Sequence, residues 1–143
     1  MSNYIDTTPE KGKDFYLNFH DKGKIVMLNL LKFRQKADYS NSEHIKPEEE
    51  ITGEEAYQLY IKNTLPELEK SGGRIIYYGK SKSFLIGPES EKWDAILVVE
   101  HVSVEKFMAF AQNKEYLKTV GHRTAALEDS RLLPSTEIQN YTY

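Results

Sequence analysis

The architecture of this chain follows from one apolar segment, which reads Lys24-Ile25-Val26-Met27-Leu28-Asn29-Leu30-Leu31-Lys32-Phe33-Arg34. Because nearly every position inside it is apolar, it is predicted to form a β-strand that is covered on both faces, and such a strand is central in its sheet. Asn29 is the exception, and it shares a face with Met27. A buried amide that lacks a hydrogen bond costs roughly 1–3 kcal/mol, so we expect Asn29 to face another polar group, a water molecule or a ligand.

The 143 residues fit a single domain, because the chain is long enough for one hydrophobic core and too short for two. No apolar run approaches the roughly 20 residues that span a bilayer, and the first residues lack the features of a secretory signal. The absence of cysteine excludes disulfides and thiolate chemistry. We therefore expect a cytoplasmic protein without a membrane segment. The net charge of −3, with both signs interspersed, argues against a nucleic-acid partner.

A helix is predicted before the apolar strand, because Thr8 can cap it, Pro9 suits its first position and Glu10 its first turn. After the strand, residues 35–51 are polar and contain Pro47, which predicts a long loop. Connections of more than about 12 to 15 residues are often lids or binding loops. We expect this loop to be mobile and to lie over any pocket; a mobile insertion without a function is the alternative.

Helices and strands then alternate. Thr52 and Glu55 form a capping box that begins a helix, which Pro66 should kink or split. A strand over residues 74–86, interrupted near the glycine at position 79, and a second strand over residues 93–102 are predicted to make a hairpin. The remaining predicted elements are a helix capped by Ser103, a further helical turn that stops at Gly121, and a last strand over residues 127–133.

The order strand, helix, strand, strand, helix, strand is that of a ferredoxin-like α+β domain with a four-stranded antiparallel sheet. We expect this domain to occupy residues 1–143, with its core at about 24–134 and an extra N-terminal helix. Helices cover only one face of such a sheet, and an apolar uncovered face needs a partner, most simply a second copy. We therefore expect a homodimer with facing sheets, whose interface includes the face that carries Met27 and Asn29.

Several segments resemble a known family. They are Met27 to Phe33, the helix start with Gly53, Ala56, Tyr57 and Tyr60, the glycines Gly72, Gly73, Gly79 and Gly87, the pair Trp93-Asp94, and Arg123 to Leu132. Through these segments, over about residues 24–134, the chain resembles the domain of unknown function 1330 family, within the dimeric α/β-barrel superfamily. The resemblance implies a ferredoxin-like protomer that pairs into a barrel. It selects no activity, because the superfamily includes proteins that resemble monooxygenases, lactone isomerases, dehydratases and haem enzymes.

Polar side chains gather at one end of the predicted sheet. If the apolar strand runs parallel to the strand that begins at Trp93 and antiparallel to the last strand, its carboxyl end brings together Lys32, Arg34, His101, His122, Arg123 and Asp129. Asp129 and Arg131 are two positions apart and share a face, beside the strand that holds Asn29. A cluster of Asn29, Asp129 and Arg131 against an apolar wall can orient and ionise a small substrate. The alternative is a structural network in which an arginine pairs with Asp129 and Asn29 completes the hydrogen bonds.

From this arrangement we predict catalytic roles for Asp129 and His122, and substrate contacts for Asn29, Lys32, Arg34, Tyr57, Arg123 and Arg131. His122 has the pKa range of a general base, although a histidine at a helix end is more often a dipole partner or a surface residue. Tyr57 can contact a substrate or pack in the core with a polar tip. The four histidines lack the spacing of metal ligands, so we expect no metal ion and no cofactor.

Three functions stay open. The first is a cofactor-independent enzyme, of the monooxygenase, isomerase or dehydratase kind, that binds a small apolar or aromatic metabolite in a barrel pocket. The second is a non-catalytic module that binds such a metabolite. The third is a structural homodimer whose barrel is filled by its own side chains. An open cavity beside Asn29 favours the first two functions, and a filled interior favours the third.

Overall fold

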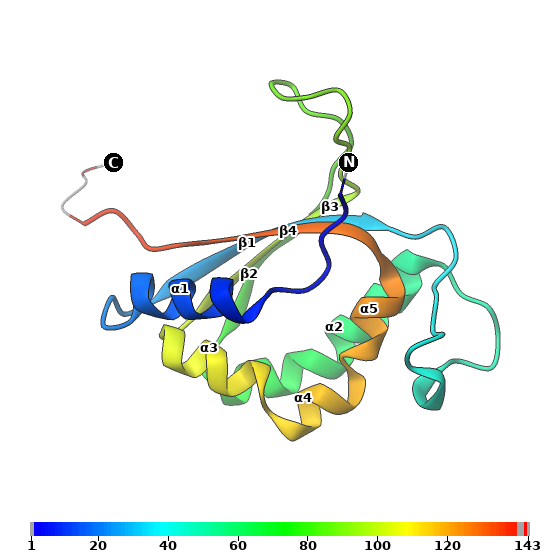
Figure 1. The fold of residues 1–143 in the computed structure, drawn as a ribbon, viewed down its shortest axis with the longest axis horizontal. Coiled ribbons are helices and arrows are strands. Elements are labelled where there is room, and N and C mark those ends of the chain that lie inside the picture. Colours follow the sequence, from blue (N-terminus) through cyan, green and yellow to red (C-terminus); the bar gives the residue numbers. More distant parts are fainter. Residues whose placement is uncertain (1, 140–141, 143) are drawn as a thin grey trace.

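The computed structural model describes residues 2–139 and 142, and it places a four-stranded sheet over a layer of helices (Figure 1). The strands are β1 (Ile25–Phe33), β2 (Arg74–Lys80), β3 (Ala95–His101) and β4 (Leu127–Ser135). Their order in the sheet is β2-β3-β1-β4, and every neighbouring pair is antiparallel. The predicted ferredoxin-like fold is confirmed, and the apolar strand β1 is central in the sheet.

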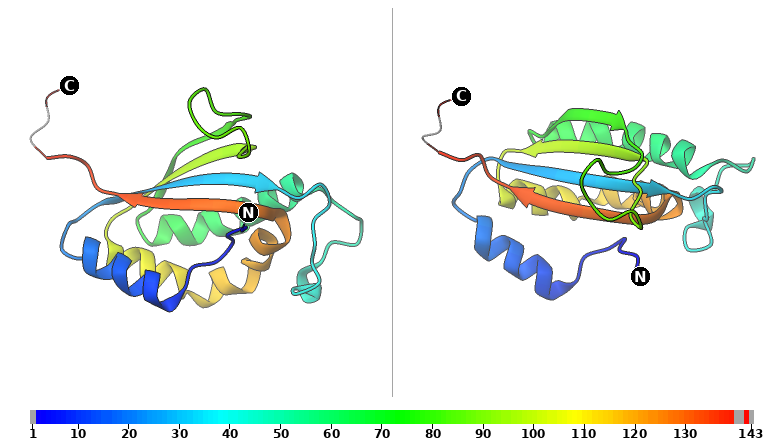
Figure 2. Two further views of the ribbon diagram at one scale, coloured as in Figure 1. Left: turned by 45° about the horizontal axis from the view of Figure 1, so that its top comes forward. Right: turned by 90° about the horizontal axis from the view of Figure 1, so that it is seen from above.

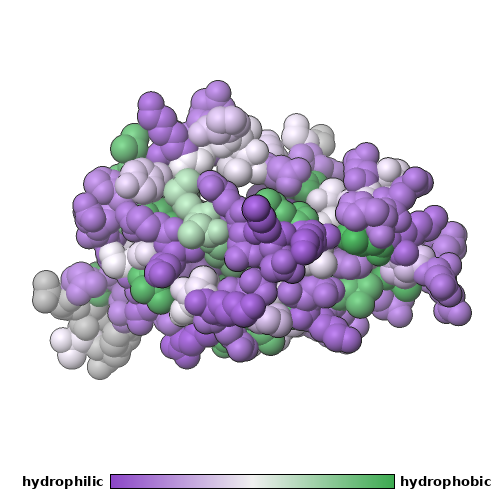
Figure 3. Space-filling model, turned by 90° about the horizontal axis from the view of Figure 1, so that it is seen from below, coloured by the Kyte–Doolittle hydropathy of each residue, from purple (hydrophilic) through white to green (hydrophobic). Residues whose placement is uncertain are grey.

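The α-helices lie on one side of the sheet (Figures 1 and 2). They are α1 (Pro9–Phe19), α2 (Gly53–Lys70), α3 (Val104–Ala111), α4 (Lys114–Thr119) and α5 (Gly121–Ala126), and a short 3-10 helix, η1 (Glu43–Ile45), lies in the long loop. The outer surface of the helix layer is mainly hydrophilic (Figure 3). Among the described residues, no helix is both long enough and apolar enough to cross a membrane.

The predicted helix starts are confirmed in detail. The Thr8 side chain accepts a hydrogen bond from the backbone of Lys11, and Thr52 and Glu55 exchange side-chain-to-backbone hydrogen bonds of 3.0 and 2.9 Å. Pro66 lies inside α2 without splitting it.

Gly121 was expected to stop a helix, but it begins α5. A methyl group at this position would collide with the side chain of Ser42, so the glycine permits close approach of the long loop.

The core lies between the sheet and the helices, in two clusters. Leu31 of β1 belongs to the larger cluster, in which Tyr57 of α2 is 1% exposed. Ile25 and Met27 belong to the smaller one, together with Val104 of α3. Burial of a large aliphatic side chain contributes roughly 1.5–3 kcal/mol, so these clusters fix the helix layer against β1.

The face of β1 that carries Met27 and Asn29 is therefore the face that the helices cover. The prediction that this face forms a dimer interface was wrong, because β1 is apolar on both sides and alternation cannot tell which side faces the helices. The helix-free side is called the open face below. According to the strand register, it carries Val26, Leu28 and Leu30 of β1, Tyr77 of β2, Ile96 and Val98 of β3, and Leu133 of β4.

Candidate functional site

The direction of β3 determines which residues meet at the carboxyl end of β1. In the antiparallel register, Ile25 lies opposite His101 and Leu31 lies opposite Ala95. The predicted parallel pairing of these strands was wrong. The crossover through α2 makes β2 run parallel to β1, and the hairpin between β2 and β3 then makes β3 antiparallel to both. His101 therefore lies at the far end of the sheet. The start of β4 does meet the end of β1, since Lys32 lies opposite Asp129.

Asn29 satisfies its amide within the sheet. Its Nδ2 atom donates to the backbone oxygens of Leu97 and Met27, at 3.1 and 3.4 Å. The polar group that the sequence required is therefore supplied by backbone carbonyls of β3 and β1 rather than by a ligand. Asn29 lies opposite Leu132, on the other face of the sheet from Asp129 and Arg131, so the predicted cluster of these three residues does not form.

Asp129 and Arg131 do form the predicted ion pair, with 2.7 Å between Oδ1 and Nη1. The same carboxylate oxygen accepts hydrogen bonds from the backbone N–H groups of Tyr4 and Ser130. Burial raises the pKa of Asp129, but these hydrogen bonds outweigh that effect and hold the pKa below its usual value. The carboxylate is thus an ionised anchor for neighbouring backbone, which suits a structural role better than proton transfer.

Lys32 and Arg34, at the end of β1, have different surroundings. Lys32 turns to Glu128, with 3.0 Å between Nζ and Oε2, and this hydrogen-bonded charge raises the pKa of Lys32. The backbone N–H of Arg34 donates to Ala126, and its carbonyl oxygen accepts from Gly53. The buried Nε atom of Arg34 has no hydrogen-bond partner among the described residues. Of the two, Arg34 is the one that lines the cleft described below.

His122 is buried and bonded to the long loop. Its Nδ1 atom lies 2.6 Å from the hydroxyl of Tyr39, and both side chains are less than a tenth exposed. Burial lowers the pKa of His122, so the ring is neutral and its Nδ1 atom can accept a hydrogen bond from the Tyr39 hydroxyl. The middle of the long loop therefore packs against α5, and only Gln35 at its start reaches the cleft. The expectation that this loop covers the pocket was wrong.

Arg123 and Tyr57 also have structural partners. Nη1 of Arg123 donates to the carbonyl oxygen of Ile5 at 2.9 Å, which holds the N-terminal segment against α5. The ring of Tyr57 packs against Phe33 and Tyr78, with centroids 5.5 and 6.3 Å away. Burial raises the pKa of the Tyr57 phenol well above its usual value. Of the two alternatives for Tyr57, the structure favours core packing.

A cleft of about 660 Å³ lies between the start of α2 and the edge of the sheet formed by β2. It is on the helix side of the sheet, at the carboxyl end of β1. The side chains that define its character are Phe33, Glu54, Tyr78, Lys80, Lys82 and Asp94. Sequence reasoning missed all six as site residues. The available signal was the hairpin itself, because an antiparallel β3 brings Asp94 and the end of β2 to the end of β1.

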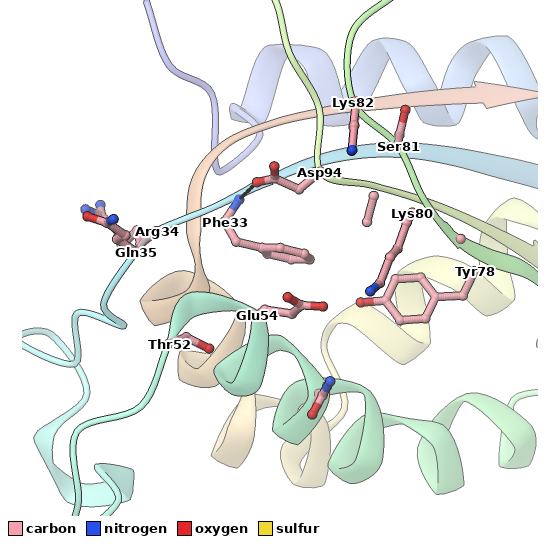
Figure 4. A pocket seen from close by; sticks show the side chains of 13 residues that line it. Phe33, Arg34, Gln35, Thr52, Glu54, Tyr78, Lys80, Ser81, Lys82 and Asp94 are labelled. Carbon is pink, nitrogen blue, oxygen red and sulfur yellow. Dashed lines mark hydrogen bonds between the residues drawn. The ribbon is translucent and has the colours of Figure 1, made fainter.

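Four of these side chains point into the same space. Figure 4 shows the ring of Phe33, the carboxylate of Glu54, the phenol of Tyr78 and the ammonium of Lys80 converging, while Arg34 lies at the far end. Burial and the nearby carboxylate of Glu54 raise the pKa of Tyr78, which keeps the phenol neutral and able to donate. The cleft thus offers two aromatic rings, a carboxylate and an ammonium group to one small molecule.

The charged side chains of the cleft differ in whether they already have a partner within the protein. Asp94 already accepts a hydrogen bond from the backbone N–H of Phe33, at 2.8 Å. Lys80, Lys82 and Glu54 form no ion pair within residues 2–139 and 142. In the same residues, no group of three or more histidines and carboxylates is placed to hold a metal ion.

The matched family is described as "Domain of unknown function (DUF1330)", and it aligns with residues 45–134. The chain belongs to this family. The match begins later than the resemblance at residues 24–134 implied. It includes the cleft residues from α2, β2 and the start of β3, and it leaves out Phe33, Arg34 and Gln35 at the end of β1 and the start of the long loop.

Two solved structures are similar to this DUF1330 protein over almost its whole length. The crystal structure of methylated RPA0582 protein is 35% identical with a TM-score of 0.85, and the alignment covers 99% of this chain and 100% of that one. The RPA0582 protein of unknown function from Rhodopseudomonas palustris is 36% identical with a TM-score of 0.84, over 96% of this chain and 99% of that one. No curated protein matches the chain.

Proposed function

We propose that this DUF1330 protein binds a small aromatic acid in the cleft between α2 and β2. The observation that carries the proposal is the convergence of Phe33, Tyr78, Lys80 and Glu54 on one space of about 660 Å³ (Figure 4). Pockets for small molecules have volumes of roughly 300–1,000 Å³ and combine apolar walls with a few convergent polar groups.

The lining residues suggest how such a ligand would lie. Its ring would pack between Phe33 and Tyr78, and its carboxylate would accept a charge-assisted hydrogen bond from Lys80. A hydroxyl or amino group on the ring would donate to Glu54, which has no ion-pair partner among the described residues. The site differs from the expected barrel pocket, because it lies between the sheet and a helix of the same chain.

The surroundings of His122 and Asp129, for which catalytic roles were predicted, favour binding without chemistry over catalysis. His122 is buried against Tyr39, and the carboxylate of Asp129 is occupied by Arg131 and two backbone N–H groups. Neither residue lines the cleft. A general acid or base must be within hydrogen-bond reach of the proton that it transfers, and these two side chains are not placed for that.

Calorimetric titration with 4-hydroxybenzoate tests this proposal, with 4-hydroxybenzyl alcohol as the uncharged counterpart. The acid should bind more tightly than the alcohol, and Lys80→Ala should weaken binding of the acid about tenfold, the value of one charge-assisted hydrogen bond. Lys106→Ala removes an exposed lysine on α3 and should leave the affinity unchanged. Equal affinity for acid and alcohol, or no effect of Lys80→Ala, would show that the cleft does not select an aromatic acid.

A homodimer formed through the open face is the second part of the proposal. Half-buried apolar side chains of β1 and β3 meet there, and Tyr77 and Leu133 beside them are 54% and 63% exposed. The helix layer has a mainly hydrophilic outer surface, so the open face is the side that gains from a partner (Figure 3). Sedimentation equilibrium should show a dimer at micromolar concentration, and Leu28→Lys should shift the protein toward monomer. A parent protein that stays monomeric would contradict the dimer and leave ligand binding in the cleft untouched.

A further inference from the structure

The connection between β2 and β3, residues 81–94, forms an arm that rises from the sheet on the side without helices (Figures 1 and 2). Its tip carries Leu85 and Ile86, which are 99% and 92% exposed. Single exposed apolar residues are ordinary on protein surfaces, whereas two adjacent aliphatic side chains in almost full contact with water give the tip an apolar surface that a partner could bury.

The base of this arm is firmly attached to the sheet. The backbone N–H of Asp94 donates to Leu31 of β1 at 2.8 Å, and that of Trp93 donates to Lys82 at 3.0 Å. Trp93 is 3% exposed, and the guanidinium group of Arg131 lies 4.9 Å from its ring centroid. The arm therefore leaves the sheet in a fixed direction.

The tip of the arm is held by its own side chains. Ser83 and Lys92 form a β-bridge across the arm. Phe84 folds back on Gly87 so closely that a Cβ atom at Gly87 would lie 2.7 Å from its ring. The exposure of Leu85 and Ile86 is thus imposed by local packing. A segment that is already ordered loses little conformational entropy when it docks.

The open face is small beside a typical dimer interface. With seven-residue strands in β2 and β3 and four strands in the sheet, the face measures about 23 by 19 Å, or about 440 Å², from the rise and spacing of strands. A specific interface buries roughly 800 Å² on each partner. The arm rises on the same side of the sheet and can add to the contact area.

We propose that the arm of each copy packs Leu85 and Ile86 against the open face of a second copy of this chain. This inference rests on the proposed homodimer and names the segment that secures it. A two-fold axis makes the contact reciprocal, so both arms contribute. The outer surface of the helix side is mainly hydrophilic, so the open face is the better match for the apolar tip (Figure 3).

Sedimentation equilibrium of the double variant Leu85→Ser/Ile86→Ser tests the inference. Its dimer dissociation constant should rise about 100-fold or more, because burial of large aliphatic side chains is lost from both arms at once. Leu117→Ser is the matched control, since Leu117 is 52% exposed on α4, on the helix side. It should leave the dissociation constant unchanged. Thermal unfolding of the dilute double variant should match that of the dilute parent, because the replaced side chains are exposed within one copy.

A thiol probe gives an independent measurement, because the chain has no cysteine of its own. The Ile86→Cys variant should react with a maleimide slowly where the protein is dimeric and at least ten times faster where dilution makes it monomeric. Fast reaction within a demonstrated dimer would overturn the docking of the arm while the homodimer stands. A parent that is monomeric at all concentrations would overturn both. If the arm of such a monomer bound phosphatidylcholine vesicles, the tip would be reassigned to a lipid surface.

Discussion

Arg131 donates from Nη1 to Oδ1 of Asp129 at 2.7 Å, and its guanidinium group lies 4.9 Å from the ring centroids of both Tyr4 and Trp93. The backbone N–H of Tyr4 donates to the same carboxylate oxygen. This ion pair therefore joins three distant parts of the chain: the N-terminal segment, β4 and the base of the arm. The pair therefore has a structural role, because it holds these three segments together.

Replacing Asp129 with alanine should lower the free energy of unfolding by about 2 kcal/mol, between the value for an exposed pair and that for a buried one. The side chains of Asp129 and Arg131 are 14% and 30% exposed, which places the pair between these limits. Denaturant unfolding measures the change. Glu115→Ala breaks the exposed pair with Lys118 and should have little effect. A difference below about 0.5 kcal/mol for Asp129→Ala would mean that the N-terminal segment is not held by this carboxylate.

Acid should weaken the protein partly through Asp129. The pKa of this carboxyl is lower in the folded chain than its ordinary value of 3.8, so its stabilisation is complete above that value and is lost as the pH falls through the folded pKa. Asp129→Asn removes this titration, and its stability should therefore fall less steeply than that of the parent below about pH 4. Thermal melts of both proteins across this range provide the comparison. Parallel curves would show that the carboxyl does not titrate differently on folding.

The fold could be predicted from the sequence, because the capping residues and the apolar pattern are local signals that agree with one another. Capping residues at Thr8 and Thr52 marked helix starts, and the apolar run in β1 marked a central strand. The faces of β1 were not predictable in the same way. Both faces are apolar. The strand therefore lacks the alternation of apolar and polar residues that would have shown which face meets the helices.

The candidate site depended on strand direction and on distant contacts, which the sequence does not display. Once β3 was taken as parallel to β1, His101 was placed beside Arg34, and Lys80 and Asp94 were left out. The hydrogen bond of His122 with Tyr39 spans 83 positions, and no spacing rule predicts such a contact. The pairing of Asp129 with Arg131 was predictable because the two residues share a strand face two positions apart.

Tyr39→Phe should loosen the long loop. The substitution removes the hydroxyl that bonds to Nδ1 of His122 and leaves a buried acceptor without this partner, at a cost of roughly 1–3 kcal/mol. Hydrogen exchange of residues 35–51 should become faster than in the parent, while exchange in β1 stays slow. Tyr16→Phe alters a partly exposed tyrosine on α1 and serves as the control. Unchanged exchange in the loop would show that backbone contacts alone hold it.

His101 should make the protein less stable in mild acid. Its ring is buried between Phe107 and Phe110, and burial lowers its pKa from 6.5 to about 4. The unfolded chain binds a proton below pH 6.5 and the folded chain does not, so stability falls as the pH drops from 6.5 to about 4. His101→Leu should flatten this part of the curve of stability against pH. Some loss of stability toward acid will remain, because burial also lowers the pKa of His122. His44→Leu, at an exposed position, should leave the curve unchanged.

Gly53→Ala should destabilise the contact between α2 and β1. A Cβ atom at Gly53 would collide with the backbone oxygens of Arg34 and Ala126, and backbone cannot move aside as a flexible side chain can. Gly53 also donates to the oxygen of Arg34 at 3.0 Å, so relief of the collision would stretch that hydrogen bond. The free energy of unfolding should fall by about 1–3 kcal/mol, the usual cost of overpacking.

Gly12→Ala is the matched control for this change. No atom lies within 4 Å of a Cβ built at Gly12, which is inside α1. Alanine is a better helix former, so this variant should gain about 0.5–1 kcal/mol. Because Glu54 follows Gly53 at the border of the cleft, a shift of α2 should also weaken binding of 4-hydroxybenzoate in Gly53→Ala and not in Gly12→Ala. Parent-like stability of Gly53→Ala would mean that α2 can move away from β1 freely, and the cleft would then lack the fixed wall on which the proposed ligand site depends.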